Sequence, residues 1–355
     1  MKKVSIVVVI IIIILLPIYM IMGCEDNREK LKGGYVEEDY TFPDDIQDIL
    51  DMAVLDNGNI AIIGHGNVEN RRLKDIVNEP LKYLESKNKG KTWEERKLRI
   101  PKKNIENIIA YEECKILHDG SFVFAIREFT TEELDNLDIE YLDNKNIEEY
   151  DEKINIKNPI RIVRGDSNGN LTEIPSEKLD GDNYKIISAV DKYVYLMQSS
   201  PKEITKFDVD NEESVDRINI ENERIASIVI DNKKLYINNN EEVIEYNLKN
   251  GTKEGENEVL TKNALKNYNY YRSINGKTIY LVGEDGVYSY LDGNKVIEKL
   301  IDGTSTIFED KEYHLESFME VSDNEFIAAF MNKENYKIIL KHFYYDKDAN
   351  SNNNK

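Results

Sequence analysis

One repeated pattern constrains the fold of this chain more than any other feature. A run of apolar, β-forming residues is followed by a tight turn of Asp, Asn or Gly and then by a second β-forming run. This alternation of short runs and turns is typical of an all-β protein, since amphipathic helices would place apolar residues at a period near 3.6. The six tight turns lie at residues 56–59, 118–120, 191–192, 231–232, 275–276 and 323–324.

Each of these apolar hairpins is followed by a second hairpin that is more polar. An apolar inner hairpin with a half-solvated outer hairpin is the pattern of a four-stranded β-propeller blade. In the C-terminal half, successive inner turns are about 40 to 48 residues apart, which is the period of propeller blades. The sequence therefore predicts a single β-propeller over residues 35–346. Six blades are favoured, and a seventh around residues 125–160 is the alternative.

The spacing is longer in the N-terminal half, about 62 and 72 residues, and two insertions account for the difference. Residues 67–79 are polar and loop-like. Residues 129–158 are strongly acidic, and residues 130–134 have the sequence of a helix N-cap. This acidic insertion is a candidate recognition element, with a solvated flap as the alternative.

The two ends of the predicted propeller complement each other. The last repeat supplies only three strands, whereas a spare strand-like segment, residues 35–42, precedes the first repeat. Pairing of this segment with the last repeat would close the ring and remove its exposed sheet edges. Residues 347–355 are polar and are expected to be a disordered tail.

The N-terminus has the features of an export signal. Lys2 and Lys3 precede an apolar run over residues 4–22, which is followed by Gly23, Cys24 and two acidic residues. The sequence around Gly23 and Cys24 resembles a bacterial lipobox, in which a small residue precedes a cysteine that becomes lipidated. An uncleaved transmembrane helix is the alternative, because the run is long enough to span a bilayer.

The lipobox resemblance implies a definite layout of the N-terminal region. Residues 1–23 would be a lipoprotein signal peptide, Cys24 the lipid attachment site, and residues 24–34 a tether. The protein would be anchored to the cell membrane on its extracytoplasmic face. Cys114 then has no disulfide partner in the chain, and its strand-like surroundings favour a buried structural thiol.

Charge narrows the range of partners. The chain carries 47 basic and 68 acidic residues, a net charge of −21. Nucleic acid and anionic lipid head groups are therefore poor partners for the body of the protein. Surface proteins, peptides and glycans remain as possible partners. We expect the protein itself to be a monomer.

The sharpest internal motif lies in the outer hairpin of the first repeat. Ser86, Asn88, Gly90, Thr92 and Trp93 occupy the positions of the sequence Ser-x-Asp-x-Gly-x-Thr-Trp, with Asn in place of Asp. This segment resembles the Asp-box, or BNR repeat, and the body as a whole resembles Asp-box and WD40/YVTN-like repeat proteins. The resemblance implies a turn between the outer strands of a blade, with a structural role.

The sequence contains few features that indicate catalysis. Residues 99–101, Arg-Ile-Pro, are similar to a sialidase element that binds a carboxylate, but here they follow the Asp-box rather than precede it. The four His residues are scattered without metal-ligand spacing, and there is no nucleotide-binding fingerprint or nucleophile elbow. No catalytic residue, cofactor site or metal site is predicted. The expected function is non-catalytic binding or scaffolding of a protein, peptide or glycan; the alternative is a glycan hydrolase of the sialidase-like propeller type.

Overall fold

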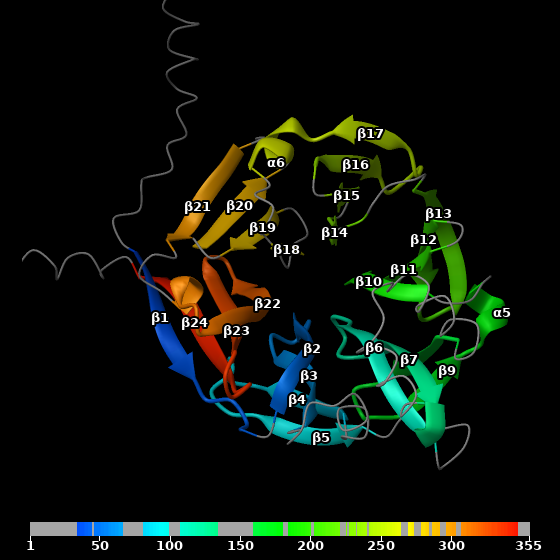
Figure 1. Ribbon diagram of the computed structural model, residues 1–355, viewed down its shortest axis with the longest axis horizontal. Helices are drawn as coiled ribbons and strands as arrows, with labels where there is room; N and C mark the ends of the chain where they lie inside the picture. The colour runs from blue at the N-terminus through cyan, green and yellow to red at the C-terminus, as the bar shows by residue number, and fades with distance from the viewer. Residues whose placement is uncertain are drawn as a thin grey trace, which may run out of the picture. The chain divides into compact units, whose positions relative to one another are not determined.

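The computed structural model describes residues 34–44, 46–66, 81–98, 107–133, 159–179, 184–199, 202–220, 225, 227–231, 233–239, 241–263, 269–272, 278–283, 286–291, 296–302 and 307–346. These residues form six four-stranded antiparallel sheets, and Figure 1 shows the sheets arranged as the blades of a β-propeller. The predicted all-β fold and the favoured number of six blades are confirmed.

Five blades follow one another along the chain, each with its strands in sequence order from the centre outward. The first contains β2 (Ile46–Val54), β3 (Ile60–Gly66), β4 (Leu81–Ser86) and β5 (Glu94–Leu98). The second contains β6 (Ile108–Ile116), β7 (Phe122–Phe129), β8 (Arg161–Gly165) and β9 (Leu171–Ile174). The third contains β10 (Tyr184–Val190), β11 (Tyr193–Ser199), β12 (Lys202–Asp208) and β13 (Glu213–Asn219). The fourth contains β14 (Ser227–Ile230), β15 (Lys234–Asn238), β16 (Val243–Asn247) and β17 (Lys253–Glu256). The fifth contains β18 (Asn269–Arg272), β19 (Thr278–Gly283), β20 (Gly286–Leu291) and β21 (Val296–Asp302).

The sixth blade joins the two ends of the chain. Its order is β1-β24-β23-β22, so β1 (Gly34–Tyr40) forms the outer strand beside β24 (Ile338–Asp346), β23 (Glu325–Asn332) and β22 (Tyr313–Ser322). The predicted closure by an N-terminal strand is thus present. Short helices α5 (Ser176–Leu179), α6 (Glu258–Asn263) and η2 (Ile307–Glu309) lie in connections between blades.

The chain divides into two compact units. Residues 37–344 form the larger unit, which contains the first five blades, most of the sixth and all the sites discussed below. The smaller unit comprises residues 1–36 and 345–355, of which the structure describes 34–36 and 345–346. Within it, the rings of Tyr35 and Tyr345 meet edge to face, with their centroids 5.4 Å apart.

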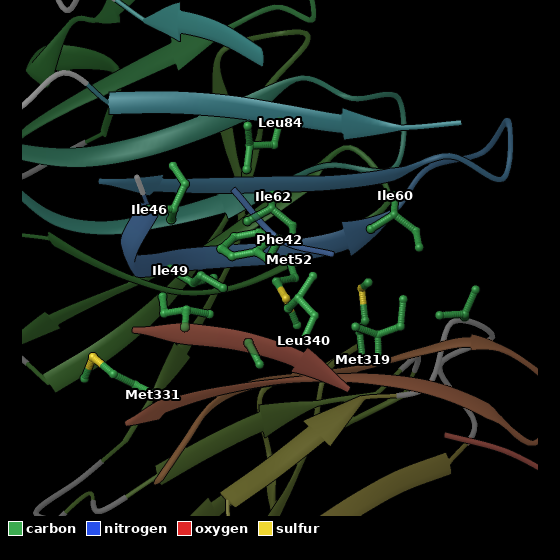
Figure 2. Close-up of a cluster of buried hydrophobic side chains, with 14 residues drawn as sticks. Phe42, Ile46, Ile49, Met52, Ile60, Ile62, Leu84, Met319, Met331 and Leu340 are labelled. Atoms are coloured by element: carbon green, nitrogen blue, oxygen red, sulfur yellow. The ribbon is translucent and has the colours of Figure 1, made fainter. Parts of the chain in front are cut away.

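Apolar side chains between neighbouring blades form the core. Figure 2 shows the cluster between the first and the sixth blade, where Ile49 and Met52 of β2 lie near Met319 of β22 and Leu340 of β24. Burial of one such side chain contributes roughly 1.5–3 kcal/mol. Since this cluster joins segments from opposite ends of the sequence, hydrophobic packing contributes to ring closure.

The start of the acidic insertion has the predicted helix cap. Thr130 Oγ1 accepts a hydrogen bond from Glu133 N at 3.2 Å, and Glu133 Oε2 accepts one from Thr130 N at 2.8 Å. This reciprocal pair is a capping box. The remainder of the insertion from residue 134 to 158, the loop-like segment at 67–79, Cys24 and the C-terminal tail lie outside the described residues.

Candidate functional site

A cavity of about 320 Å³ lies at the centre of the propeller. Residues from the innermost strand of every blade line it: β2, β6, β10, β14, β18 and β22. Its walls combine apolar residues such as Ile187 and Ile228 with Asp51, Lys115, Tyr271 and other polar residues. A cavity of this size, with few polar groups among apolar ones, is at the lower end of the range for small-molecule sites.

β-Bulges occur in four of the six innermost strands, at similar distances from the hairpin turn that follows each strand. The pairing register shifts at Leu50 in β2, Glu112 in β6, Ile187 in β10 and Glu316 in β22. Three to five paired residues separate each bulge from the following hairpin turn. Leu50, Ile187 and Glu316 all line the cavity. Because a bulge changes the direction of a side chain and interrupts the strand edge, these irregularities shape the cavity wall.

An ion pair crosses from the first blade to the second at this cavity. Lys115 Nζ lies 3.0 Å from Asp51 Oδ1, and Ile116 N donates a hydrogen bond to Asp51 Oδ2 at 2.7 Å. Burial opposes the positive charge of Lys115, but the charge and hydrogen bond of Asp51 outweigh it and raise the pKa of the lysine. Lys115 therefore stays protonated at neutral pH and forms an ion pair with Asp51.

The part of the wall formed by β18 and β22 carries two carboxylates and aromatic rings. Glu316 is paired with His314, and Glu320 Oε1 accepts a hydrogen bond from Tyr280 Oη at 2.5 Å. Tyr271 packs against Phe318, with ring centroids 5.5 Å apart. Burial, reinforced by the negative charge of Glu316, raises the pKa of Tyr271 well above its ordinary value. The phenol is thus neutral and can donate a hydrogen bond.

A second cavity, also about 320 Å³, lies beside hairpin turns of the first three blades. His118 lines both cavities, and its Nδ1 is 3.8 Å from Asp56 Oδ1. Asp119, Asp191 and Asp210 also line the second cavity. Among the described residues, no group of His, Cys, Asp and Glu side chains is arranged to hold a metal ion.

The Asp-box-like segment forms the turn between β4 and β5, the outer strands of the first blade. Ser86 Oγ accepts a hydrogen bond from Gly90 N at 2.7 Å, and Asn88 Oδ1 accepts one from Thr92 N at 2.9 Å. Asn88 also donates from Nδ2 to Thr92 Oγ1 at 2.9 Å. Gly90 has a φ of 91°, a conformation that favours glycine. These contacts are the ones that an Asp-box turn would make, and membership of that family stays a prediction.

This turn also contacts the residues that follow the closing strand β1 and a residue of the sixth blade. Trp93 Nε1 donates to Thr41 O at 2.9 Å, and the Trp93 ring meets Phe42 edge to face at 5.9 Å. Lys89 Nζ lies 2.8 Å from Glu325 Oε2 in the sixth blade. The segment therefore acts in closure, and none of its residues lines the central cavity.

The outer turns of the second and third blades lack the full Asp-box-like sequence, but they share one hydrogen-bonding feature with it. Asp166 Oδ1 accepts hydrogen bonds from the backbone N atoms of Asn168 and Asn170, both at 2.9 Å. Asp208 Oδ1 accepts from Asp210 N at 3.0 Å in the third blade. An Asx side chain thus caps the turn in each case.

The residues of the central cavity were not identified from the sequence. Each lies in an ordinary strand run, and neither the bulges nor the approach of β2 to β6 has a local sequence signal. Residues 99–101, the sialidase-like element, lie outside the described residues. No arginine is among the described residues that line the cavity. In the part of the chain that the structure describes, no helix is long and apolar enough to span a membrane.

Comparison with known proteins gives a likeness of fold. The sequence matches no protein-family model and no curated protein. Among solved structures, the chain is similar to the C-terminal WD40 domain of Sif2, with 12% identity, a TM-score of 0.41, and 85% of this chain and 74% of that chain covered. It is similar to a streptogramin B lyase with 10% identity, a TM-score of 0.47, and 90% and 100% covered. It also resembles PorZ, a surface component of the type-IX secretion system of Porphyromonas gingivalis, with 10% identity, a TM-score of 0.40, and 85% and 33% covered.

Proposed function

We propose that this protein is a lipid-anchored, extracytoplasmic binding or scaffold module, which holds a protein, peptide or glycan at the cell surface without transforming it. The observation that carries the proposal is the central cavity, to which all six blades contribute. Such a cavity offers a ligand a site formed by the whole ring. The basic N-terminus, the apolar run and Cys24 are the reason for proposing that the propeller lies at a membrane surface.

The charge arrangement of the cavity favours binding over catalysis. A general acid or base needs a carboxyl group free to exchange a proton with substrate. Asp51 and Glu320 each accept a hydrogen bond from the protein, and Glu316 lies beside His314 Nε2. Sialidase chemistry needs arginines around the substrate carboxylate, and the described cavity lining has none. The glycan-hydrolase alternative is therefore the weaker one.

The anchor can be tested separately from the binding site. The full-length chain, expressed in bacteria supplied with an alkyne-labelled fatty acid, should become labelled. The Cys24→Ser variant should lose the label, whereas Cys114→Ser should keep it. An unlabelled wild-type chain that partitions with the membrane would instead identify residues 4–22 as an uncleaved transmembrane helix.

Absence of catalysis is tested with the purified full-length chain. Fluorogenic sialosides and a panel of other glycosides should be left unchanged by it over long incubation. A turnover that disappears in a Glu316→Gln or Asp51→Asn variant would refute the non-catalytic assignment. In-cell crosslinking followed by reconstitution with the purified partner tests the scaffold role, and it requires that the pair associate in isolation.

A further inference from the structure

The central cavity has features that select the chemical class of its ligand, and this step rests on the binding function proposed above. The first is the interruption of the inner strand edges. Each innermost strand is the end strand of its sheet, so its free edge faces the centre. A peptide could add to a regular edge as a further strand, but the bulges in β2, β6, β10 and β22 disrupt four of the six edges. The other two inner strands, β14 and β18, pair regularly but are only four residues long. The geometry therefore favours a compact ligand.

The second feature is that the charged groups of the cavity already have partners within the protein. Lys115 and Asp51 form an ion pair at 3.0 Å, Glu316 lies beside His314 Nε2, and Glu320 accepts a hydrogen bond from Tyr280 Oη. An ionic ligand would have to compete with these contacts and pay for its own desolvation. A neutral ligand avoids both costs.

The third feature is the mixture of hydrogen-bonding groups. An ammonium group has three donors, of which Asp51 accepts one from Lys115. Carboxylates such as Glu316 only accept, while Ser188 and Ser317, which also line the cavity, both donate and accept. A hydroxyl group is the ligand group that satisfies donors and acceptors alike.

The fourth feature is an apolar and aromatic surface beside these groups. Tyr271, Ile187 and Ile228 line the same cavity. A sugar ring has apolar C–H faces and polar hydroxyl edges, and these match the two kinds of wall. We propose that the central cavity binds one ring of a neutral sugar, either free or at the end of a glycan, held by Lys115, Glu316 and Tyr271.

The test uses the full-length chain in a detergent without a sugar head group. Saturation-transfer NMR would be recorded with glucose, galactose, mannose and N-acetylglucosamine, and with their methyl glycosides, whose blocked anomeric carbon imitates the end residue of a glycan. Leucine, putrescine and gluconate serve as zwitterionic, cationic and anionic probes. We expect at least one neutral sugar to bind. Binding of the methyl glycoside as well identifies the end of a glycan as the source, and binding of the reducing sugar alone identifies a free sugar.

Variants assign the binding to the cavity. Lys115→Met and Glu316→Gln should each weaken binding by about tenfold or more, since each removes a charge-assisted hydrogen bond. Lys249→Met, in an exposed turn, is the matched control and should bind as the wild type does. Tyr271→Phe keeps the ring and removes only the hydroxyl, so weaker binding by this variant cannot be ascribed to lost ring packing. A circular-dichroism spectrum of each variant shows whether the fold is intact.

Two results would overturn the inference. One is binding of only the charged probes, and the other is sugar binding that the cavity variants leave unchanged. If no sugar binds but a purified partner from crosslinking does, the sugar site is wrong while the scaffold function stands. If neither binds, both are wrong.

Discussion

The contact between the Asp-box-like turn and the closing strand gives the most specific stability prediction. Gly90 has a φ of 91°, and a Cβ added there would lie 2.6 Å from Tyr40 Cδ2. Tyr40 in turn stacks on His342 of β24, with ring centroids 4.6 Å apart. A Gly90→Ala change would therefore strain the turn and displace a ring that packs at the junction between the first and the sixth blade.

The expected loss of unfolding free energy in the Gly90→Ala variant has two parts. A left-handed conformation costs an L-residue about 1–2 kcal/mol. Overpacking against Tyr40 adds about 1–3 kcal/mol, because the ring cannot move without disturbing its stack on His342. Gly58 is a matched control: its φ is 80°, yet a Cβ there would have no atom within 4 Å. Gly58→Ala therefore measures the backbone part alone.

Urea unfolding is the assay. Trp93 is the only tryptophan in the chain and lies in the turn itself, so its fluorescence reports on the closure, while circular dichroism reports on all the blades. We expect Gly90→Ala to lower the free energy of unfolding by about 1–3 kcal/mol more than Gly58→Ala does. In a double-mutant cycle, Tyr40→Ala should reduce that excess. Equal destabilisation by the two glycine variants would refute the role of the Tyr40 contact.

Three further predictions concern other residues of the described structure. Trp93→Phe removes the hydrogen bond to Thr41 O and should lower the free energy of unfolding in urea by about 1 kcal/mol; an unchanged value would mean that this bond adds nothing to closure. Burial of Glu325 raises its pKa, but hydrogen bonds from three neighbouring side chains outweigh this and lower it overall. The stability that Glu325 contributes is therefore present above its unfolded pKa and lost as the pH falls through the lower folded value. Glu325→Gln should accordingly flatten the fall in unfolding free energy as the pH drops below the unfolded glutamate pKa of about 4.3, and a profile as steep as the wild type's would contradict this. Burial raises the pKa of Cys114 well above its ordinary value, so in a Cys24→Ser background its thiol should react with iodoacetamide only on unfolding, as mass spectrometry would reveal; rapid labelling of the folded chain would count against it.

Much of the architecture was accessible from the sequence because it depends on local signals. Alternating apolar runs and Asx or Gly turns specify hairpins, and their spacing specifies blades. The leftover strand at residues 35–42 and the three-stranded last repeat predicted the closure that β1 and β24 make. The hydrogen bonds of Ser86 and Asn88 also follow from a short motif, since all partners lie within a few residues.

Only the tertiary structure shows which side chains line the centre of the ring and which contacts close the ring. A bulge depends on the register between two strands, so the sequence around Leu50 or Glu316 does not reveal it. The pairing of Asp51 with Lys115 depends on the packing of two separate blades. Lys89 and Glu325 are 236 residues apart, and only closure of the ring makes them neighbours. The sequence by itself thus determined the blades, because hairpins form from near neighbours, whereas the candidate site belongs to strands that meet only when all six blades have packed.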